Sequence, residues 1–177
     1  MAETPITVLL VEDSPTQAEL VKTMLVGKSG VPLIIEWVER LSAALTRLAR
    51  GGIDVVLLDL MLPDGSGVEM VTTVLRPAPT VPVIVLTGTF PDETIALEAL
   101  RRGAQDYLFK DEVEPHDLLR AIHHAIERRR VLTALQQKIE ELERLTRIML
   151  DREERILALK EEAKALRAQL AAAPPRS

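Results

Sequence analysis

Short runs of aliphatic and β-branched residues alternate with amphipathic segments along the first 115 residues. Near-continuous runs of Val, Ile and Leu are typical of strands covered on both faces of a sheet. We expect five such strands, at Ile6–Val11, Leu33–Val38, Val55–Leu58, Val83–Leu86 and Tyr107–Phe109. Segments with helical spacing lie between them, near Pro15–Val26, Leu41–Arg50, Val68–Leu75 and Asp92–Arg102, and a fifth helix begins near Pro115. This (βα)5 alternation predicts an α/β fold with a doubly wound parallel sheet and helices on both faces.

Residues that start and stop helices support these segments. Ser14 precedes Pro15, and Gln17 follows Ser14 by three positions. This is the spacing of a capping box with proline at the first helical position. Gly103 follows the fourth helical segment and can end it in the left-handed conformation.

The pattern changes after Pro115, because no proline occurs from His116 to Ala173 and no glycine occurs after Gly103. A single continuous helix of this length is too long for one compact domain. In the later part of this helix, apolar residues follow alternating steps of three and four positions if Arg152 is counted among them. This is the spacing of the apolar seam along which the helices of a coiled coil meet. The seam consists of Leu142, Leu145, Met149, Ile156, Leu159, Ala163, Leu166 and Leu170. Leu135, Ile139 and Leu142 fit an adjoining frame, with a break in phase at Leu142.

We therefore expect a compact domain at residues 1–130, a coiled-coil helix at 131–173 that continues the fifth helix, and a disordered tail at 174–177. The alternative for the helix is a lone, solvated helix with a modest apolar stripe. A leucine stripe of this length favours self-association when it is exposed.

Composition narrows the class of protein further. Cysteine is absent, which excludes disulfides and thiolate metal sites. No apolar run approaches the roughly 20 residues that span a bilayer, and the N-terminus lacks a signal-peptide pattern, so we expect a soluble cytoplasmic protein without a membrane segment. Residues 1–130 carry 13 basic and 19 acidic side chains, whereas residues 131–177 carry 9 and 8. Neither part has the basic footprint of a nucleic-acid-binding protein, so we expect no direct DNA binding.

Chemically active side chains directly follow the predicted strands. Glu12 and Asp13 follow the first strand, Asp59 the third and Lys110 the fifth, and Thr87 lies at the end of the fourth. The carboxyl ends of parallel strands meet at one edge of a doubly wound sheet, where ligands bind. Singly, each residue has an ordinary explanation as a turn residue, a helix cap or a surface charge. Their convergence at one edge favours a shared site.

The chemistry of such a site follows from its residue types. Hard oxygen ligands without Cys or His favour Mg²⁺. Asp59 is then a candidate carboxylate nucleophile that forms an acyl phosphate. We expect Lys110 to pair with one phosphoryl oxygen and Thr87 to donate a hydrogen bond to another.

Four segments of the chain resemble the receiver domain of response regulators in bacterial two-component signalling. They are VLLVEDSP at 8–15, VVLLDLMLPDGSG at 55–67, VIVLTG at 83–88 and DYLFK at 106–110, and the resemblance covers about residues 5–130. It implies a flavodoxin-like fold with phosphorylation at Asp59. It also implies Mg²⁺ binding by Glu12, Asp13, Asp59 and the backbone carbonyl of Met61.

The resemblance implies partners and a switch as well. Thr87 and Lys110 would hold the phosphoryl group, and Tyr107 would move inward with Thr87. A histidine kinase or phosphotransfer protein would be the donor, so the chain would be a phosphoacceptor that assists its own phosphorylation and dephosphorylation rather than an enzyme. Residues 151–162 are similar to the helical linkers of bacterial signalling proteins, and we expect a parallel homodimer that transmits the signal through the coiled coil. Asp111 takes the place of the proline that follows the lysine in many receivers, so we expect an altered turn there.

Two alternative functions belong to other classes of protein, one an enzyme and one a scaffold. A haloacid-dehalogenase-type phosphatase also uses an aspartate nucleophile at a strand end, but it has a second aspartate two residues later, where this chain has Met61. The other alternative is a non-enzymatic coiled-coil scaffold, or pseudo-receiver, that acts by protein–protein interaction. The presence of every acidic, hydroxyl and ammonium group of the receiver site favours the phosphoacceptor.

Overall fold

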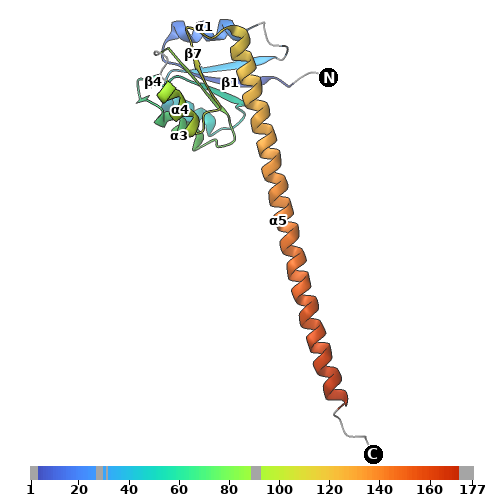
Figure 1. The fold of residues 1–177 in the computed structure, drawn as a ribbon. Coiled ribbons are helices and arrows are strands. Elements are labelled where there is room, and N and C mark those ends of the chain that lie inside the picture. Colours follow the sequence, from blue (N-terminus) through green and yellow to red (C-terminus); the bar gives the residue numbers. More distant parts are fainter. Residues whose placement is uncertain (1–3, 27–29, 31, 89–92, 172–177) are drawn as a thin grey trace, which may run out of the picture. The chain divides into compact units, whose positions relative to one another are not determined.

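The computed structural model describes residues 4–26, 30, 32–88 and 93–171. Five parallel strands form one sheet in the order β2-β1-β3-β6-β7 (Figure 1). Their bounds are Ile6–Val11 (β1), Leu33–Val38 (β2), Val55–Leu58 (β3), Val83–Thr87 (β6) and Asp106–Phe109 (β7). This is the strand order of a doubly wound, flavodoxin-like sheet, so the predicted fold class is confirmed.

The strand boundaries differ little from the prediction. β6 extends by one residue to Thr87, and β7 begins one residue earlier, at Asp106. A short antiparallel pair, Met61–Leu62 (β4) with Gly65–Ser66 (β5), was not expected. Two-residue strands show no hydrophobic period, so the sequence pattern could not indicate them.

Two cores lie on opposite faces of the sheet, because successive strand residues point to opposite sides. Val8 and Leu10 of β1 belong to the core that α1 and the first part of α5 cover, whereas Leu9 and Val11 belong to the core that α2, α3 and α4 cover. The helices are Pro15–Leu25 (α1), Leu41–Leu48 (α2), Glu69–Leu75 (α3), Glu93–Arg101 (α4) and Pro115–Ala171 (α5). The helices on both faces explain why β3 and β6 consist only of buried residues.

Helix termini confirm some of the predicted signals. Ser14 Oγ accepts a hydrogen bond from the Gln17 backbone N–H at 3.4 Å, as a capping box requires. The Ser14 N–H donates to Glu12 Oε1 at 3.2 Å, while the Gln17 side chain contacts Lys110. Gly103 has a φ of +103° after α4, which confirms its role as a helix stop. Asp92, where we expected that helix to begin, lies outside the described residues.

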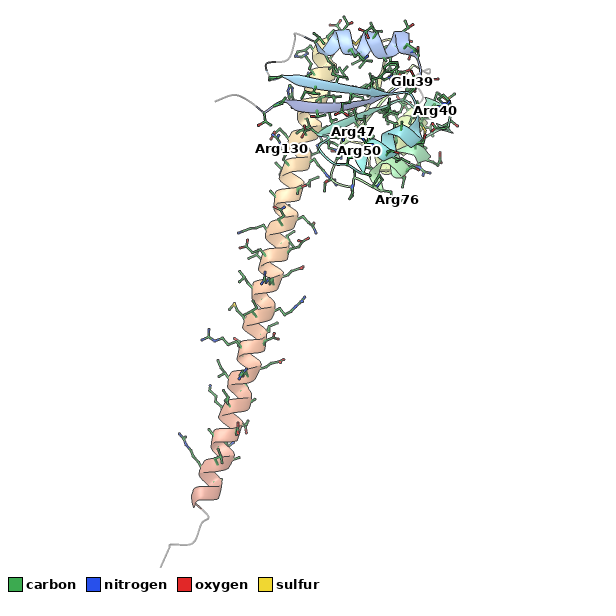
Figure 2. The ribbon with its side chains drawn as sticks, turned by 180° about the vertical axis from the view of Figure 1, so that it is seen from behind. Glu39, Arg40, Arg47, Arg50, Arg76 and Arg130 are labelled. Atoms are coloured by element: carbon green, nitrogen blue, oxygen red, sulfur yellow. The ribbon has the colours of Figure 1, made fainter. Side chains whose placement is uncertain are left out.

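The first four helices are slightly shorter than their patterns. α1 ends at Leu25 rather than Val26, α2 at Leu48 rather than Arg50 and α4 at Arg101 rather than Arg102, and α3 begins at Glu69 rather than Val68. Arg47 of α2, labelled in Figure 2, forms a bidentate ion pair with Glu36 of β2, with N–O distances of 2.5 and 2.8 Å. This pair joins α2 to the edge strand of the sheet.

Helix α5 is continuous from Pro115 to Ala171, as predicted. The chain forms two compact units that divide between Val131 and Leu132. Within the first unit, Leu118, Ile122 and Ile126 are buried in the sheet core. None of the helices in the described residues is long and apolar enough to cross a membrane.

In the second unit, all side chains described from residue 134 to 168 are exposed, and Figure 2 shows them radiating around the helix. The large seam residues are between 42% exposed, at Ile156, and 65% exposed, at Met149. The Leu170 side chain, the predicted helix end at Ala173 and the predicted disordered tail at 174–177 lie outside the described part of the chain.

Candidate functional site

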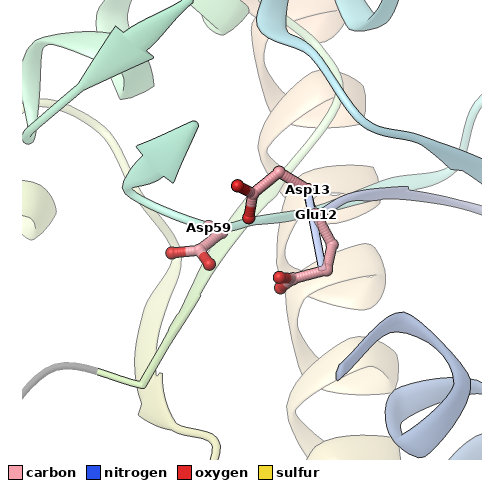
Figure 3. A group of neighbouring side chains, drawn as sticks. All are labelled: Glu12, Asp13 and Asp59. Carbon is pink, nitrogen blue, oxygen red and sulfur yellow. The ribbon is translucent and has the colours of Figure 1, made fainter. Parts of the chain in front are cut away.

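Three acidic side chains meet where β1 and β3 end. Val11 of β1 pairs with Leu58 of β3, and the Asp59 N–H donates to the Val11 carbonyl at 3.0 Å. Helices α1 and α2 follow β1 and β2, and the strand order reverses at β1 and β3, which is where doubly wound sheets bind ligands. One oxygen from each of Glu12, Asp13 and Asp59 lies within 4.8 Å of the other two (Figure 3). The structure therefore gathers the predicted acidic residues into one cluster.

Glu12 is the most buried of these acids, with 1% of its surface exposed. Trp37 Nε1 donates to the Glu12 backbone carbonyl at 2.7 Å and so fixes the chain at the end of β1. Burial raises the pKa of the Glu12 carboxyl, because the ionised form loses hydration, while the hydrogen bond and charge of Lys110 oppose that rise. A nearby cation therefore favours the carboxylate form of Glu12.

Lys110 provides that cation from the end of β7. Its backbone N–H donates to the Thr87 carbonyl at 2.9 Å, and its side chain is only 5% exposed. The ammonium Nζ donates to Asp59 Oδ2 and to Gln17 Oε1, each at 2.6 Å, and also to Glu12 Oε2. Each of the three N–H donors of the ammonium thus has an oxygen acceptor.

Thr87 and Tyr107 lie on the neighbouring strands β6 and β7. Thr87 is 1% exposed and pairs in register with Phe109. Tyr107 packs against the core under α2, α3 and α4, and its ring meets the Phe109 ring edge-on, with centroids 5.2 Å apart. These positions suit the expected switch pair, whose coupled movement stays a prediction.

The β4–β5 hairpin folds back beside Asp59. The Met61 N–H donates to Asp59 Oδ1 at 3.1 Å, so the residue whose carbonyl is the expected backbone ligand contacts the carboxylate through its N–H. Asp64 lies between β4 and β5 and accepts the N–H groups of Leu41 and Ser42 at 2.8 and 2.9 Å, so it caps α2 from outside that helix. The Ser42 backbone N–H and hydroxyl, together with the Leu41 N–H, lower the pKa of Asp64 to about 2.

The turn after Lys110 closes without proline. The N–H groups of Glu112 and Val113 both donate to the Phe109 carbonyl, at 3.2 and 2.9 Å. Since the Lys110 ammonium contacts Asp59, the presence of Asp111 does not keep the lysine from the site.

The acidic cluster fits a small, hard divalent cation. Its donors are carboxylate oxygens, and their spacing of up to 4.8 Å is close to the separation of about 4 Å between opposite ligands of one Mg²⁺. The residue types and their spacing therefore suit Mg²⁺ better than a softer metal.

Three contacts in or near the site were not predicted from the sequence. Gln17 was assigned only to a helix cap, yet its carboxamide contacts Lys110, 93 positions away in sequence. Trp37 donates to the backbone carbonyl of Glu12, and Asp64 accepts from the backbone N–H of Leu41. No local pattern reports such contacts, because they depend on how separate elements pack.

Fold and site together define a doubly wound α/β protein with an acidic site at the carboxyl edge of its sheet. The sequence profile described as the response regulator receiver domain matches residues 8–123, which is more than half of the chain. The chain belongs to the response regulator receiver family.

Similar proteins with known sequences include transcriptional regulators. The regulatory protein LuxO of Vibrio cholerae is 35% identical over 101 residues, which cover 57% of this chain and 21% of LuxO. The KDP operon transcriptional regulatory protein KdpE of Escherichia coli is 38% identical over 103 residues, which cover 58% of this chain and 44% of KdpE. The match thus spans less than half the length of either relative.

Solved structures agree on the fold. The signal receiver domain of a putative LuxO repressor protein from Vibrio parahaemolyticus is 26% identical, with a TM-score of 0.65, and the match covers 75% of this chain and 98% of that one. A fusion that contains a trimeric coiled coil of yeast Spc42 is 22% identical, with a TM-score of 0.64, and the match covers 85% and 99%. This second likeness concerns the fold alone.

Proposed function

We propose that this chain is a response regulator that accepts a phosphoryl group on Asp59 from a histidine kinase or a phosphotransfer protein. The observation that carries the proposal is the contact of 2.6 Å between Lys110 Nζ and Asp59 Oδ2 at the edge of a cluster of three carboxylates. The contact brings a carboxylate oxygen beside a positive charge, which suits the proposed nucleophile. Membership of the receiver family supports the same function.

The transfer forms one bond and breaks another. A carboxylate oxygen of Asp59 attacks the phosphorus of a phosphohistidine, the O–P bond forms as the P–N bond breaks, and the imidazole nitrogen keeps the bonding electrons. Since two anions must meet, fixed positive charge and hydrogen-bond donors lower the barrier. Lys110 contributes the charge, and the Thr87 hydroxyl donates to a second phosphoryl oxygen.

Glu12, Asp13, Asp59 and the Met61 backbone carbonyl are the residues that would hold Mg²⁺, which when bound neutralises charge on the phosphoryl oxygens. Two contacts keep this set in place. Trp37 Nε1 holds the Glu12 carbonyl, and the Met61 N–H holds Asp59 Oδ1. The Glu12 backbone and the Asp59 carboxylate are therefore restrained before a metal ion or a phosphoryl group arrives.

Intact-protein mass after incubation with Mg²⁺ and phosphoramidate tests the proposal. We expect one added phosphoryl group in the wild type and in Asp111→Ala, a matched exposed aspartate next to Lys110, and none in Asp59→Asn. An unchanged wild-type mass contradicts the proposal and favours the scaffold, or pseudo-receiver, function.

We further propose that residues 1–130 form the receiver domain and that residues 131–173 pair in parallel with the same segment of a second copy. The support is the exposed seam, in which leucines such as Leu142, Leu145 and Leu159 are more than half exposed. Leaving such a stripe in water is unfavourable, whereas pairing buries it. Because residues 115–171 form one helix rather than a helix-turn-helix, we propose a protein partner rather than DNA for this part of the chain.

A further inference from the structure

Gln17 reaches the acidic site with a side chain to which neither the helix cap nor the proposed phosphoryl site gives a role. It lies in the first turn of α1, and its Oε1 accepts a hydrogen bond from Lys110 Nζ at 2.6 Å. An ammonium group can only donate, so the carboxamide atom that faces Lys110 must be the oxygen. The Gln17 NH2 group is then left as a donor at the other end of the carboxamide.

The same carboxamide lies against Gly88, the residue after Thr87. A Cβ built on Gly88 would be 3.9 Å from Gln17 Nε2 and 4.0 Å from Oε1, which is ordinary van der Waals distance. Gln17 therefore spans from Lys110 to the end of β6. Lys110 and Thr87, the last residue of β6, are the two residues that we propose hold the phosphoryl group.

Lys110 must release one of its present acceptors before it can donate to a phosphoryl oxygen. Two of them, on Asp59 and Glu12, are buried carboxylates, and their bonds to the ammonium are charge-assisted. The third, on Gln17, is neutral and belongs to an exposed residue. Gln17 is therefore the acceptor that Lys110 releases at the lowest cost.

Once Lys110 no longer donates to it, the Gln17 carboxamide can change from a hydrogen-bond acceptor to a donor. Rotation about its terminal side-chain bond meets only a low barrier and brings the NH2 donor to where the oxygen was. Gln17 Oε1 and Asp59 Oδ2 are each 2.6 Å from Lys110 Nζ, so they lie no farther apart than twice that distance. A phosphoryl group on Asp59 is large enough to bridge that gap.

We propose that Gln17 is a further phosphoryl-binding residue that exchanges partners during the transfer. Its Oε1 accepts from Lys110 before the transfer, and its Nε2 donates to a phosphoryl oxygen on Asp59 afterwards. This inference rests on the proposed phosphoacceptor function of Asp59.

Two substitutions separate the two halves of this role. Gln17→Met keeps the length of the side chain but neither accepts nor donates a strong hydrogen bond. Gln17→Glu keeps the shape and the acceptor, but it cannot donate and adds a negative charge. Both leave the backbone N–H that Ser14 caps, and the residue is exposed, so we expect both variants to fold. Gln137→Met is the matched control at an exposed position of α5.

The first measurement is the rate of phosphorylation by phosphoramidate at saturating Mg²⁺. We expect Gln17→Met to be slower than the wild type by about tenfold, as for one lost hydrogen bond to a charged group. Gln17→Glu is slower again, by about another tenfold, because its carboxylate repels the phosphoryl oxygens. Gln137→Met keeps the wild-type rate.

The second measurement needs no metal. In metal-free protein, acetylation of Lys110 by acetic anhydride reports how firmly its ammonium is held. We expect faster acetylation in Gln17→Met than in the wild type, by about threefold or more, because its side chain keeps its length but no longer accepts a hydrogen bond from Lys110. A third measurement is the affinity for Mg²⁺. Trp37 is the only tryptophan in the chain, and its Nε1 donates to the Glu12 carbonyl, so its fluorescence reports Mg²⁺ binding. The Mg²⁺ affinity of Gln17→Met should equal that of the wild type.

The outcomes distinguish this inference from the function on which it rests. A wild type that accepts no phosphoryl group overturns both. A wild type that is phosphorylated at Asp59, together with wild-type rates in Gln17→Met and Gln17→Glu, overturns the role of Gln17 alone. Equal slowing of these two variants with unchanged Lys110 acetylation indicates a structural role and also overturns it.

Discussion

Asp64 shows how one carboxylate outside the acidic cluster shapes the segment that follows Asp59. It accepts two backbone N–H groups from the start of α2, and it also accepts the Ser42 hydroxyl at 2.7 Å. The β4–β5 hairpin is thereby joined to a helix on the α2 side of the sheet. Negative charge at a helix N-terminus is favourable for the helix as well.

This contact predicts a particular dependence of stability on pH. The folded protein lowers the pKa of Asp64 from 3.8 to about 2, so the carboxylate stabilises the fold above its unfolded pKa. That stabilisation is lost as the pH falls through the folded value. We predict that the melting temperature falls more in the wild type than in Asp64→Asn between about pH 5 and pH 2. Asp64→Asn should melt at a lower temperature than the wild type at pH 7.

A matched control for this prediction is Asp151→Asn, at an exposed position of α5. It should follow the wild type at each pH. Parallel melting curves for the wild type and Asp64→Asn would show that the Asp64 cap contributes nothing to stability.

At this scale, the sequence predicts best the residues that follow strands directly. Asp59 and Lys110 could be placed at one edge because each directly follows a predicted strand, and parallel strands bring their ends together. The contact of Gln17 with Lys110 could not be predicted, because a capping-box spacing explains Gln17 equally well. Only the packing of α1 beside the end of β7 decides between those two partners.

Among the elements, the end of α4 depends most on one residue. Gly103 has a φ of +103°, and a Cβ at this position would lie 2.8 Å from Leu75 Cδ1. We predict that Gly103→Ala destabilises the protein by about 1–2 kcal/mol through the positive φ, and that the end of the Leu75 side chain shifts to make room for the new methyl group. Chemical denaturation measures this loss as a lower midpoint.

Gly30→Ala is the control for this substitution. A Cβ there would have no atom of the described residues within 4 Å, and its φ is not positive, so we expect a change within about 0.5 kcal/mol. If Gly103→Ala were as stable as Gly30→Ala, then the helix stop would not require glycine.

The elements themselves follow closely from the hydrophobic pattern where they are long or fully buried. Strand β1 has the predicted bounds because Pro5 precedes its hydrophobic run and Glu12 follows it. The hairpin at Met61–Leu62 and Gly65–Ser66 depends instead on turn geometry and on the Asp64 cap. Local period does not encode either of these.

In the whole molecule, the proposed coiled coil has a matched internal control. Leu159 lies on the proposed seam and Leu157 lies off it, although the two are similarly exposed, at 56% and 62%. We predict that Leu159→Lys weakens self-association by about tenfold or more, because each chain loses a buried leucine, and that Leu157→Lys has little effect. Analytical ultracentrifugation of the variants and of residues 1–130 measures this.

The same experiment tests whether phosphorylation reaches the coiled coil. Helix α5 contributes Leu118 and Ile122 to the sheet core and continues through the seam. We therefore expect the dissociation constant of the wild type to change on phosphorylation, and that of Asp59→Asn to stay constant. Equal weakening of self-association by Leu157→Lys and Leu159→Lys contradicts the proposed seam. A trimer in solution contradicts the proposed dimer. A dissociation constant that phosphorylation leaves unchanged contradicts the proposed coupling.

The most direct test of the account is to locate the acyl phosphate. Borohydride reduces an aspartyl phosphate to homoserine, so peptide mass spectrometry after phosphorylation and reduction identifies the residue that carried the phosphoryl group. We predict homoserine at position 59 and aspartate at positions 13 and 64. Homoserine at another position, or at none while the intact mass increases, contradicts Asp59 as the phosphoacceptor.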